Sequence, residues 1–258
     1  MSRLYLLCDD DFAQIERFLP RDPLGRGRPP KVSNRDALEG VLYGLRTGTP
    51  WRDLPAEYGR WHTMYMRWIR WIERGVWWDM WKLLQRLKPR ELEMVFLDST
   101  VVRAHQHAAG ARKKRGEQAI GRSRGGLTTK IHLLCASESD GLEVELSAGQ
   151  RNDAPVGEAM LQGLDPRDGI THAALDKAYD SNPIRTLLNA KGINPVIPPK
   201  ANRVELIDYD KQLYKQRNKV ERLFNKIKQF RRIATRYEKL DANFLAFVVL
   251  ALIVILLR

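Results

Sequence analysis

Two short apolar runs that each end in an aspartate decide the fold: residues 94–98 read Met-Val-Phe-Leu-Asp, and residues 173–176 read Ala-Ala-Leu-Asp. Short apolar runs bounded by polar turns are typical of buried β-strands. Asp98 and Asp176 are therefore each expected where a strand gives way to a turn. Because ligand sites of α/β sheets form at strand ends, these two carboxylates can converge in one cleft although they lie far apart in the sequence.

The segments around these runs alternate between strand signals and helix signals. Further strand-like stretches follow the first run, and capped helices that stop at glycine or proline separate the later strands. In chain order the expected elements are strands at 127–137 and 142–148, helices at 153–164 and 181–192, a strand at 193–197 and a helix at 209–230. Three strands followed by alternating helix and strand predict an α/β domain with a mixed sheet.

The N-terminal part of the chain is predicted to be helical, with a domain boundary near residue 92. Capping residues and stop signals place helices at 9–18, at 33–46, near 51–58 and at 61–74. Short helices, a turn and a basic helix together look like a helix-turn-helix module. Residues 1–91 are therefore expected to form an all-α, helix-turn-helix-like domain, and residues 92–258 the α/β domain.

The helix at 61–74 has an aromatic side and a basic side. The spacing of Trp61, Tyr65, Trp68 and Ile72 predicts one buried face. The other side carries Arg67 and Arg70, which are candidate DNA contacts if this is the reading helix of the module. All seven tryptophans fall between positions 51 and 81, and we expect them to form core rather than to stack on bases.

Positive charge is concentrated in two stretches of the chain. The formal net charge is +13 over 258 residues. Residues 103–130 have a net charge of +7 and residues 200–240 one of +8, whereas residues 131–199 have −5. This pattern predicts two contact strips for a polyanion, such as double-stranded DNA, on either side of an acidic middle.

Cysteine content and the apolar C-terminal segment narrow the class of protein further. Two cysteines, Cys8 and Cys135, are too few for a disulfide framework or a four-cysteine zinc site and favour a reducing compartment. Residues 244–257 are fourteen apolar residues without a charge. A membrane span needs about 20 such residues, so this segment is expected to be a buried helix, and no membrane association is predicted.

A third carboxylate, Glu221, lies on the helix at 209–230 among basic side chains. At about 100° per residue, one narrow stripe of that helix holds Tyr214, Arg217, Glu221 and Lys228. An adjacent arc is apolar and can pack on the sheet. Two aspartates at strand ends and one glutamate from a helix suit hard divalent cations, which prefer oxygen ligands. Two such ions could activate water and stabilise the leaving oxygen in phosphodiester cleavage, while the bases hold phosphates.

The spacing Tyr-(2)-Arg-(3)-Glu-(6)-Lys at 214–228 resembles the third motif of the DDE transposases of bacterial insertion sequences, in the group that includes the IS-five family. The runs that contain Asp98 and Asp176 are similar to the first and second motifs, with Ala178 where relatives usually have glycine. Two further segments resemble the same family, Gly48-Thr-Pro-Trp-Arg-Asp-Leu-Pro55 and Gly121-Arg-Ser-Arg-Gly-Gly-Leu-Thr-Thr-Lys130. The resemblance covers nearly the whole chain.

The resemblance implies a ribonuclease-H-like catalytic domain in which Asp98, Asp176 and Glu221 bind two Mg²⁺ or Mn²⁺ ions. It implies a transposase that cuts double-stranded DNA at the terminal inverted repeats of an element and joins the exposed 3′-hydroxyl to target DNA. A homo-oligomer on DNA and a bacterial, cytoplasmic, nucleoid-associated protein are further expectations. The absence of a GxxxxGK[ST] loop from the sequence agrees with a reaction that needs no ATP.

Several basic and acidic residues leave alternatives open. The run Arg112, Lys113, Lys114 and Arg115 is expected to contact phosphate in a glycine-rich loop. The segment Arg26–Pro29 resembles a minor-groove hook, although a basic linker is the better interpretation. His105 and His107 resemble zinc ligands but have no nearby cysteine in the sequence. Asp180 is interpreted as a capping residue rather than a metal ligand.

Two rival functions remain compatible with the sequence. One is a domesticated nuclease of the same fold, which cuts DNA but does not join it. The other is a non-catalytic DNA-binding repressor of the element. The three acids at motif positions argue against the repressor, because binding alone does not require them.

Overall fold

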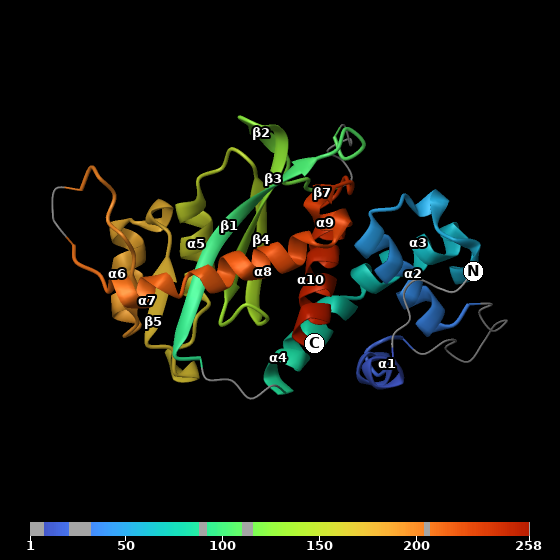
Figure 1. Ribbon diagram of the computed structural model, residues 1–258, viewed down its shortest axis with the longest axis horizontal. Coiled ribbons are helices and arrows are strands. Elements are labelled where there is room, and N and C mark those ends of the chain that lie inside the picture. Colours follow the sequence, from blue (N-terminus) through green and yellow to red (C-terminus); the bar gives the residue numbers. More distant parts are fainter. Residues whose placement is uncertain (1–7, 21–31, 88–91, 110–115, 204–206, 258) are drawn as a thin grey trace.

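The computed structural model describes residues 8–20, 32–87, 92–109, 116–203 and 207–257. The basic run Arg112–Arg115 and the segment Arg26–Pro29, both singled out in the sequence, lie outside these residues. Figure 1 shows the described chain as a sheet crossed by helices, with the N-terminal helices gathered at one end.

The sheet is mixed, as the order of elements predicts. Strand β1 (Met94–Ala104) is central and runs antiparallel to β3 (Gly126–Cys135), which in turn runs antiparallel to β4 (Gly141–Ala148). On its other side β1 pairs in parallel with β5 (His172–Leu175), and β5 pairs in parallel with β6 (Asn194–Val196). The resulting order, β4-β3-β1-β5-β6, places both aspartate-bearing runs next to each other in the middle of the sheet.

Two short strands that the sequence did not reveal extend this sheet. Strand β2 (Gly121–Ser123) forms a hairpin with the start of β3, and β7 (Thr235–Arg236) pairs with the end of β1. Runs of two or three residues are too short to show a period-2 pattern, so no sequence signal distinguishes them from loops.

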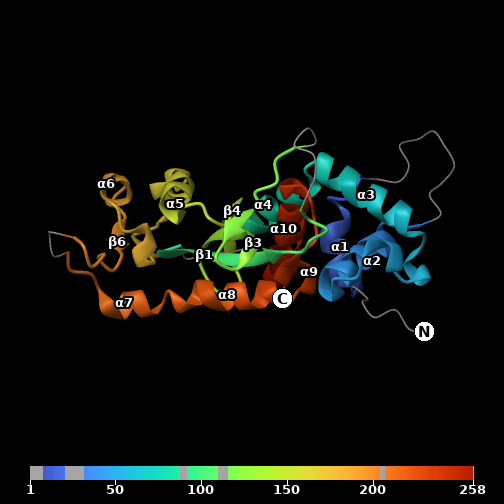
Figure 2. The same cartoon turned by 90° about the horizontal axis from the view of Figure 1, so that it is seen from above.

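Helices cover both faces of the sheet. Helices α5 (Asp153–Gln162) and α6 (Asn182–Ala190) lie on one face, and α7 (Lys211–Lys215), α8 (Asn218–Lys228) and α10 (Asp241–Leu257) on the other (Figure 2). Side chains of β1 alternate between the two layers. Val95 and Leu97 belong to the apolar cluster of α5 and α6, whereas Phe96 and Val102 belong to the cluster of α8 and α10.

The expected helix at 209–230 is present but is interrupted once. Between α7 and α8, Gln216 and Arg217 donate their backbone N–H groups to carbonyls three residues back, at 3.0 Å each, which tightens one turn. Both figures nevertheless show α7 and α8 as one nearly straight rod across the sheet.

Helix α10 is the apolar C-terminal segment, and it is buried as predicted. It packs between the sheet and helices α3 (Trp61–Glu73) and α4 (Val76–Leu87), so that apolar side chains on all its sides have partners. No helix in the described part of the chain is long and apolar enough to cross a membrane.

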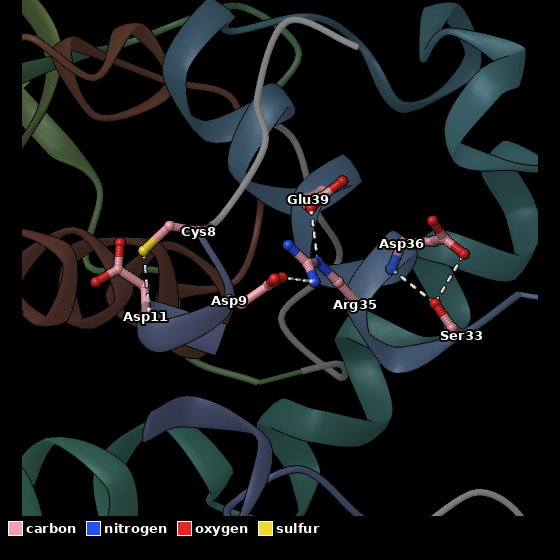
Figure 3. Close-up of polar contacts among 7 residues, drawn as sticks. All are labelled: Cys8, Asp9, Asp11, Ser33, Arg35, Asp36 and Glu39. Carbon is pink, nitrogen blue, oxygen red and sulfur yellow. Dashed lines mark hydrogen bonds and ion pairs between the residues drawn. The ribbon is translucent and has the colours of Figure 1, made fainter. Parts of the chain in front are cut away.

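The remaining N-terminal helices follow the capping signals closely. Helix α2 (Asn34–Thr47) begins after Ser33, whose Oγ accepts from the N–H of Asp36 at 3.0 Å, and ends at Gly48 with φ +74°. Helix α1 (Asp9–Glu16) is tied to it by Arg35, which contacts both Asp9 and Glu39 (Figure 3).

The prediction of the buried face of α3 is wrong, because the helix is rotated about its axis relative to the predicted orientation. The buried side chains are Met64, Trp68 and Trp71, whereas Trp61, Tyr65 and Ile72 remain partly exposed. The helix period defines the width of an apolar stripe, but the position of the packing partners selects its centre. Here Phe247 of α10 stacks on Trp68 at 4.4 Å between ring centroids, and Trp77 of α4 covers Trp71.

Candidate active site

Asp98 lies in the middle of β1 on the side that faces α8. It follows Phe96 by two residues, so its side chain points into the same layer. The backbone N–H of Ser99 donates to Asp98 Oδ1 at 2.8 Å. The side chain is only 16% exposed, which makes it an acid at the edge of the core rather than at the end of the strand, since β1 continues to Ala104.

Asp176 is the residue that directly follows the neighbouring strand, β5. In the parallel pair β1·β5 the residue Leu97 is opposite Leu175, so Asp98 and Asp176 each come next after a pair of opposite residues. Burial raises the pKa of Asp98, Arg217 and the Ser99 N–H lower it, and the negative charge of Asp176 raises it again. The net result is a raised pKa, chiefly because the carboxylate is buried, with a smaller contribution from Asp176.

Arg217 joins the third carboxylate to this pair. Its Nη1 donates to Asp98 Oδ2 at 2.7 Å, and its Nη2 donates to Glu221 in the first turn of α8. Burial alone would lower the pKa of Arg217, but the charges of Asp98, Glu221 and Asp176 raise it overall. Two of the three predicted acids, Asp98 and Glu221, therefore bind one guanidinium group, and the charge of the third, Asp176, acts on the same group.

The two other motif side chains on this helix also lie at the site. Lys228 Nζ donates to Thr100 Oγ1 at 2.6 Å. Thr100 is two residues beyond Asp98 on β1, and burial lowers the pKa of Lys228. The ring of Tyr214 lies against Arg217, with 5.7 Å from the guanidinium carbon to the ring centroid. Tyr214, Arg217, Glu221 and Lys228 thus share one side of the α7–α8 rod.

The donor set fits a hard divalent cation, although the side chains do not close around one. Asp98 and Glu221 bind one positively charged group close to Asp176, and oxygen ligands are those that Mg²⁺ and Mn²⁺ prefer. Among the described residues no three His, Cys, Asp or Glu side chains are close enough together to hold an ion. The Arg217 guanidinium now occupies the position between Asp98 and Glu221.

Asp180 is structural, in agreement with its interpretation as a capping or turn residue. Its buried carboxylate accepts from Arg185 at 2.8 Å, from Arg203 at 2.6 Å and from the N–H of Lys200 at 2.8 Å. Burial raises its pKa, but these donors lower it further, to about 2. A carboxylate with three donors has no free oxygen for an ion.

Other predicted contacts are distributed around the site. His105 and His107 lie together near the end of β1, with ring centroids 4.6 Å apart. Arg70 is exposed on α3, and Arg67 donates to Asn34 Oδ1 at 3.2 Å. Both arginines belong to α3, which lies at the N-terminal end of the molecule, away from α8 (Figure 1).

Sequence reasoning missed Ser99 and Thr100 as site residues. Thr100 holds Lys228, and the N–H of Ser99 holds Asp98. The signal was present, because period 2 along a strand places residues 96, 98 and 100 on one face. It was missed because the strand was expected to end at Asp98.

Comparison with known proteins finds a matching transposase family for each part of the chain. Residues 89–256 match the family described as "Transposase DDE domain", and residues 7–81 match "Putative transposase of IS4/5 family". The chain is 44% identical over 110 residues to the uncharacterized protein y4sN of Sinorhizobium fredii, covering 43% of this chain and 86% of that protein. It is 36% identical over 135 residues to the "Putative transposase for insertion sequence element IS6501" of Brucella ovis, covering 51% of this chain and all of that protein.

Solved structures with a similar course of the chain include two transposase complexes. The piggyBac synaptic complex with hairpin DNA has a TM-score of 0.45 at 16% identity, over 76% of this chain and about half, 48%, of that chain. The Mos1 mariner paired-end complex with Mn has a TM-score of 0.32 at 14% identity, over 89% of this chain and 74% of that chain. The match to the catalytic domain model over residues 89–256 carries the assignment: the chain belongs to the family of DDE transposases, enzymes that cut and transfer DNA strands with divalent metal ions.

Proposed function

We propose that Asp98, Asp176 and Glu221 are the catalytic carboxylates and that together they hold two Mg²⁺ or Mn²⁺ ions. The observation that carries the proposal is the Arg217 guanidinium, which is bound to Asp98 and Glu221. The negative charge of Asp176 also helps to raise the pKa of this guanidinium. A site in which two carboxylates already bind one cation, with a third close enough to act on it by its charge, is suited to binding other cations. When bound, the ions would supply an activated water and neutralise the phosphate undergoing cleavage.

The chain's own residues would position the DNA strand. Lys228, held against β1 by Thr100, supplies a cation near Asp98 for a phosphate oxygen. Tyr214 supports the Arg217 guanidinium. Arg217, whose guanidinium carries parallel N–H groups, can also donate to a phosphate of the DNA strand.

We further propose an IS-five-like insertion-sequence transposase that acts on the terminal inverted repeats of its element and on target DNA. The domain division at 1–91 and 92–258, with Arg67, Arg70 and the run Arg112–Arg115 as DNA contacts, remains part of this proposal. So do assembly of two or more copies on the DNA, independence from ATP and a place at the bacterial nucleoid in the cytoplasm. The matches of residues 7–81 and 89–256 to two transposase families support it.

A strand-cleavage and joining assay tests the proposal. The full chain is incubated with a linear element end and Mg²⁺ or Mn²⁺, and nicked and joined strands are followed. We expect metal-dependent products that disappear in Asp98→Asn, Asp176→Asn and Glu221→Gln while DNA binding persists. Asp168→Asn, which changes an exposed acid away from the site, is the matched control and should keep full activity.

The same assay separates the rivals. Cleavage without joining would indicate a domesticated nuclease, and binding without either product would indicate a repressor. Full activity of Glu221→Gln would contradict the assignment of the three carboxylates.

A further inference from the structure

The α7–α8 rod carries a second row of cations that the catalytic site does not use. Its members are spaced so that they share one side of the helices, at i, i+4, i+8, i+11 and i+15. We call them the outer basic stripe: Lys211, Lys215, Lys219, Arg222 and Lys226.

The contacts of Arg222 and Lys226 show that these two side chains point away from the catalytic site. Arg222 donates to Glu138 at 2.9 Å and Lys226 to the same carboxylate at 3.4 Å, in the turn between β3 and β4. The neighbouring residue Glu221 instead reaches Arg217. Successive helix residues differ by about 100° in direction, so the rod presents its acid to one side and its outer basic stripe to another.

The outer basic stripe borders an open pocket that is larger than a phosphate group. The pocket has a volume of about 340 Å³ and is lined by Lys215, Lys219 and Arg222, by the acid Glu138 and by neutral polar side chains of the rod and of the β3–β4 turn. Lys219 is held in place there, because its Nζ donates to Gln216 Oε1 at 3.0 Å and lies 5.1 Å from the ring centroid of Phe96. Against five cations, Glu138 is the acid that pairs with the stripe among the described residues.

The length and position of the outer basic stripe suit a DNA backbone. Fifteen residues of helix span roughly 22 Å at 1.5 Å per residue, which is several phosphates of one strand. Figure 1 shows α7 at the end of the sheet opposite the N-terminal helices. The stripe runs along the whole rod, from Lys226 on α8 to Lys211 at the start of α7, so it extends to the end of the sheet that lies opposite the N-terminal helices.

We infer that the outer basic stripe binds the backbone of the target duplex, the second DNA of the joining reaction. The inference rests on the proposed function, since it requires that joining takes place at Asp98, Asp176 and Glu221. Joining brings two DNA molecules to one set of carboxylates, and the rod offers two separate sides for them. The stripe reads no sequence, because lysine and arginine contacts to phosphates are independent of the bases.

The test compares two pairs of exposed cations. Lys215→Gln/Arg222→Gln removes two charges from the outer basic stripe, and Lys82→Gln/Arg86→Gln removes a matched Lys and Arg from the exposed side of α4. With a precut element end and a plasmid target, we expect joining at limiting target to fall about tenfold in the first pair. Cleavage of an uncut element end should stay within about twofold in both pairs.

A binding measurement makes the test independent of catalysis. Affinity of the full chain for a random duplex is measured against salt concentration. Loss of two phosphate contacts should reduce the slope of log K against log salt by about 2. Glu138→Gln, which releases Arg222 and Lys226, should tighten this binding, a gain that a misfolded variant cannot imitate.

The outcomes are distinguishable. A parallel fall of cleavage and joining would assign the outer basic stripe to the element end and overturn the inference, as would unchanged joining or an unchanged salt slope. Absence of any product from the unmodified chain would instead contradict the proposed function, and the salt slope would still decide whether the stripe binds DNA.

Discussion

At residue scale, the Arg217 guanidinium makes a contact that no other side chain could reproduce. Two of its nitrogens donate to carboxylates on different elements, Asp98 on β1 and Glu221 on α8. A lysine at this position has a single charged nitrogen on a flexible stem and cannot hold both oxygens in a fixed geometry. Arg217 is therefore expected to be a positioning residue whose charge alone is not sufficient.

We predict that Arg217→Lys reduces single-turnover cleavage of an element end by roughly 100-fold, although the charge is kept. The measurement is the cleavage rate over a range of Mg²⁺ or Mn²⁺ concentrations. Arg86→Lys on α4 is the control for a general effect of the replacement and should cleave normally. Cleavage by Arg217→Lys within twofold of the unmodified chain would show that the two donating nitrogens of the Arg217 guanidinium are not needed.

His132 gives the fold a pH dependence at residue scale. It lies buried on β3, where its Nε2 is 2.7 Å from Ser147 Oγ and its Nδ1 has no hydrogen-bond partner among the described residues. Burial lowers its pKa to about 4, from an ordinary value of 6.5. The folded protein therefore keeps this histidine neutral where the unfolded chain would protonate it.

The sign of the effect follows. The contribution of neutral His132 to the free energy of unfolding is complete above pH 6.5 and is lost as the pH falls toward about 4. The loss is about 1.4 kcal/mol per pH unit. We predict that His132→Gln flattens the free energy of unfolding over this range. The difference between the two proteins isolates His132, because Glu143 and Glu145, whose pKa values burial raises, titrate in both. Parallel curves for both proteins would contradict the prediction.

At element scale, one side chain of α9 (Arg231–Ala234) connects the N-terminal segment 48–55 to the catalytic part. Arg232 pairs with Glu238 at 2.7 Å and donates to the Thr49 carbonyl at 2.8 Å. Its guanidinium carbon lies 5.1 Å from the ring centroid of Trp51 and 4.9 Å from that of Phe247. The segment that resembles other transposases in the sequence is thus fixed by a buried ion pair.

We predict that Arg232→Met destabilises the protein by about 3–5 kcal/mol, because Glu238 is then left buried without its cation. Glu238→Gln in the Arg232→Met background should recover a large part of this loss. Unfolding in denaturant measures both. If the losses of the two single variants simply add in the double variant, the pair is not coupled and the interpretation is wrong.

Much of the element order could be predicted because local signals agree with the fold. The runs before Asp98 and Asp176 are strands, and Ser33 and Gly48 delimit α2 as their capping chemistry requires. The centre of the α3 face could not be predicted. It depends on where Phe247, almost two hundred residues later, packs, and a helix period holds no information about its partner.

The members of the candidate site could be proposed from the sequence, but their arrangement could not. Period 3.6 places Arg217 and Glu221 on one stripe, yet it gives no indication that Arg217 reaches across to Asp98. That contact depends on how α8 crosses β1, which is a tertiary property.

At the scale of the whole molecule, one hydrophobic core extends through both parts of the chain. Side chains of α2, α3 and α4 belong to the same buried cluster as those of β1, β3 and α8. Helix α10 joins them, since it contacts α3 and α4 as well as β4 and α8. Because the two parts share this core, the domains predicted at 1–91 and 92–258 are expected to unfold together.

The chain contains a separate probe for each part. All seven tryptophans lie between positions 51 and 81, so their fluorescence reports on the N-terminal helices. Cys135 is a free, fully buried thiol at the end of β3, and its labelling in a Cys8→Ser background reports on the sheet. We predict that fluorescence and thiol labelling change at the same denaturant concentration, as a two-state transition requires.

Phe247→Ala sharpens this prediction, because Phe247 touches Trp68 and Arg232 at the joint between the two parts. Removing a buried phenylalanine costs about 3–5 kcal/mol. With one shared core, the fluorescence and thiol midpoints should fall together and by the same amount. Leu87→Ala, at a side chain that is 58% exposed on α4, should move neither. A shift of the tryptophan transition alone would mean that the N-terminal helices fold as an independent unit and that α10 is only a contact surface between two domains.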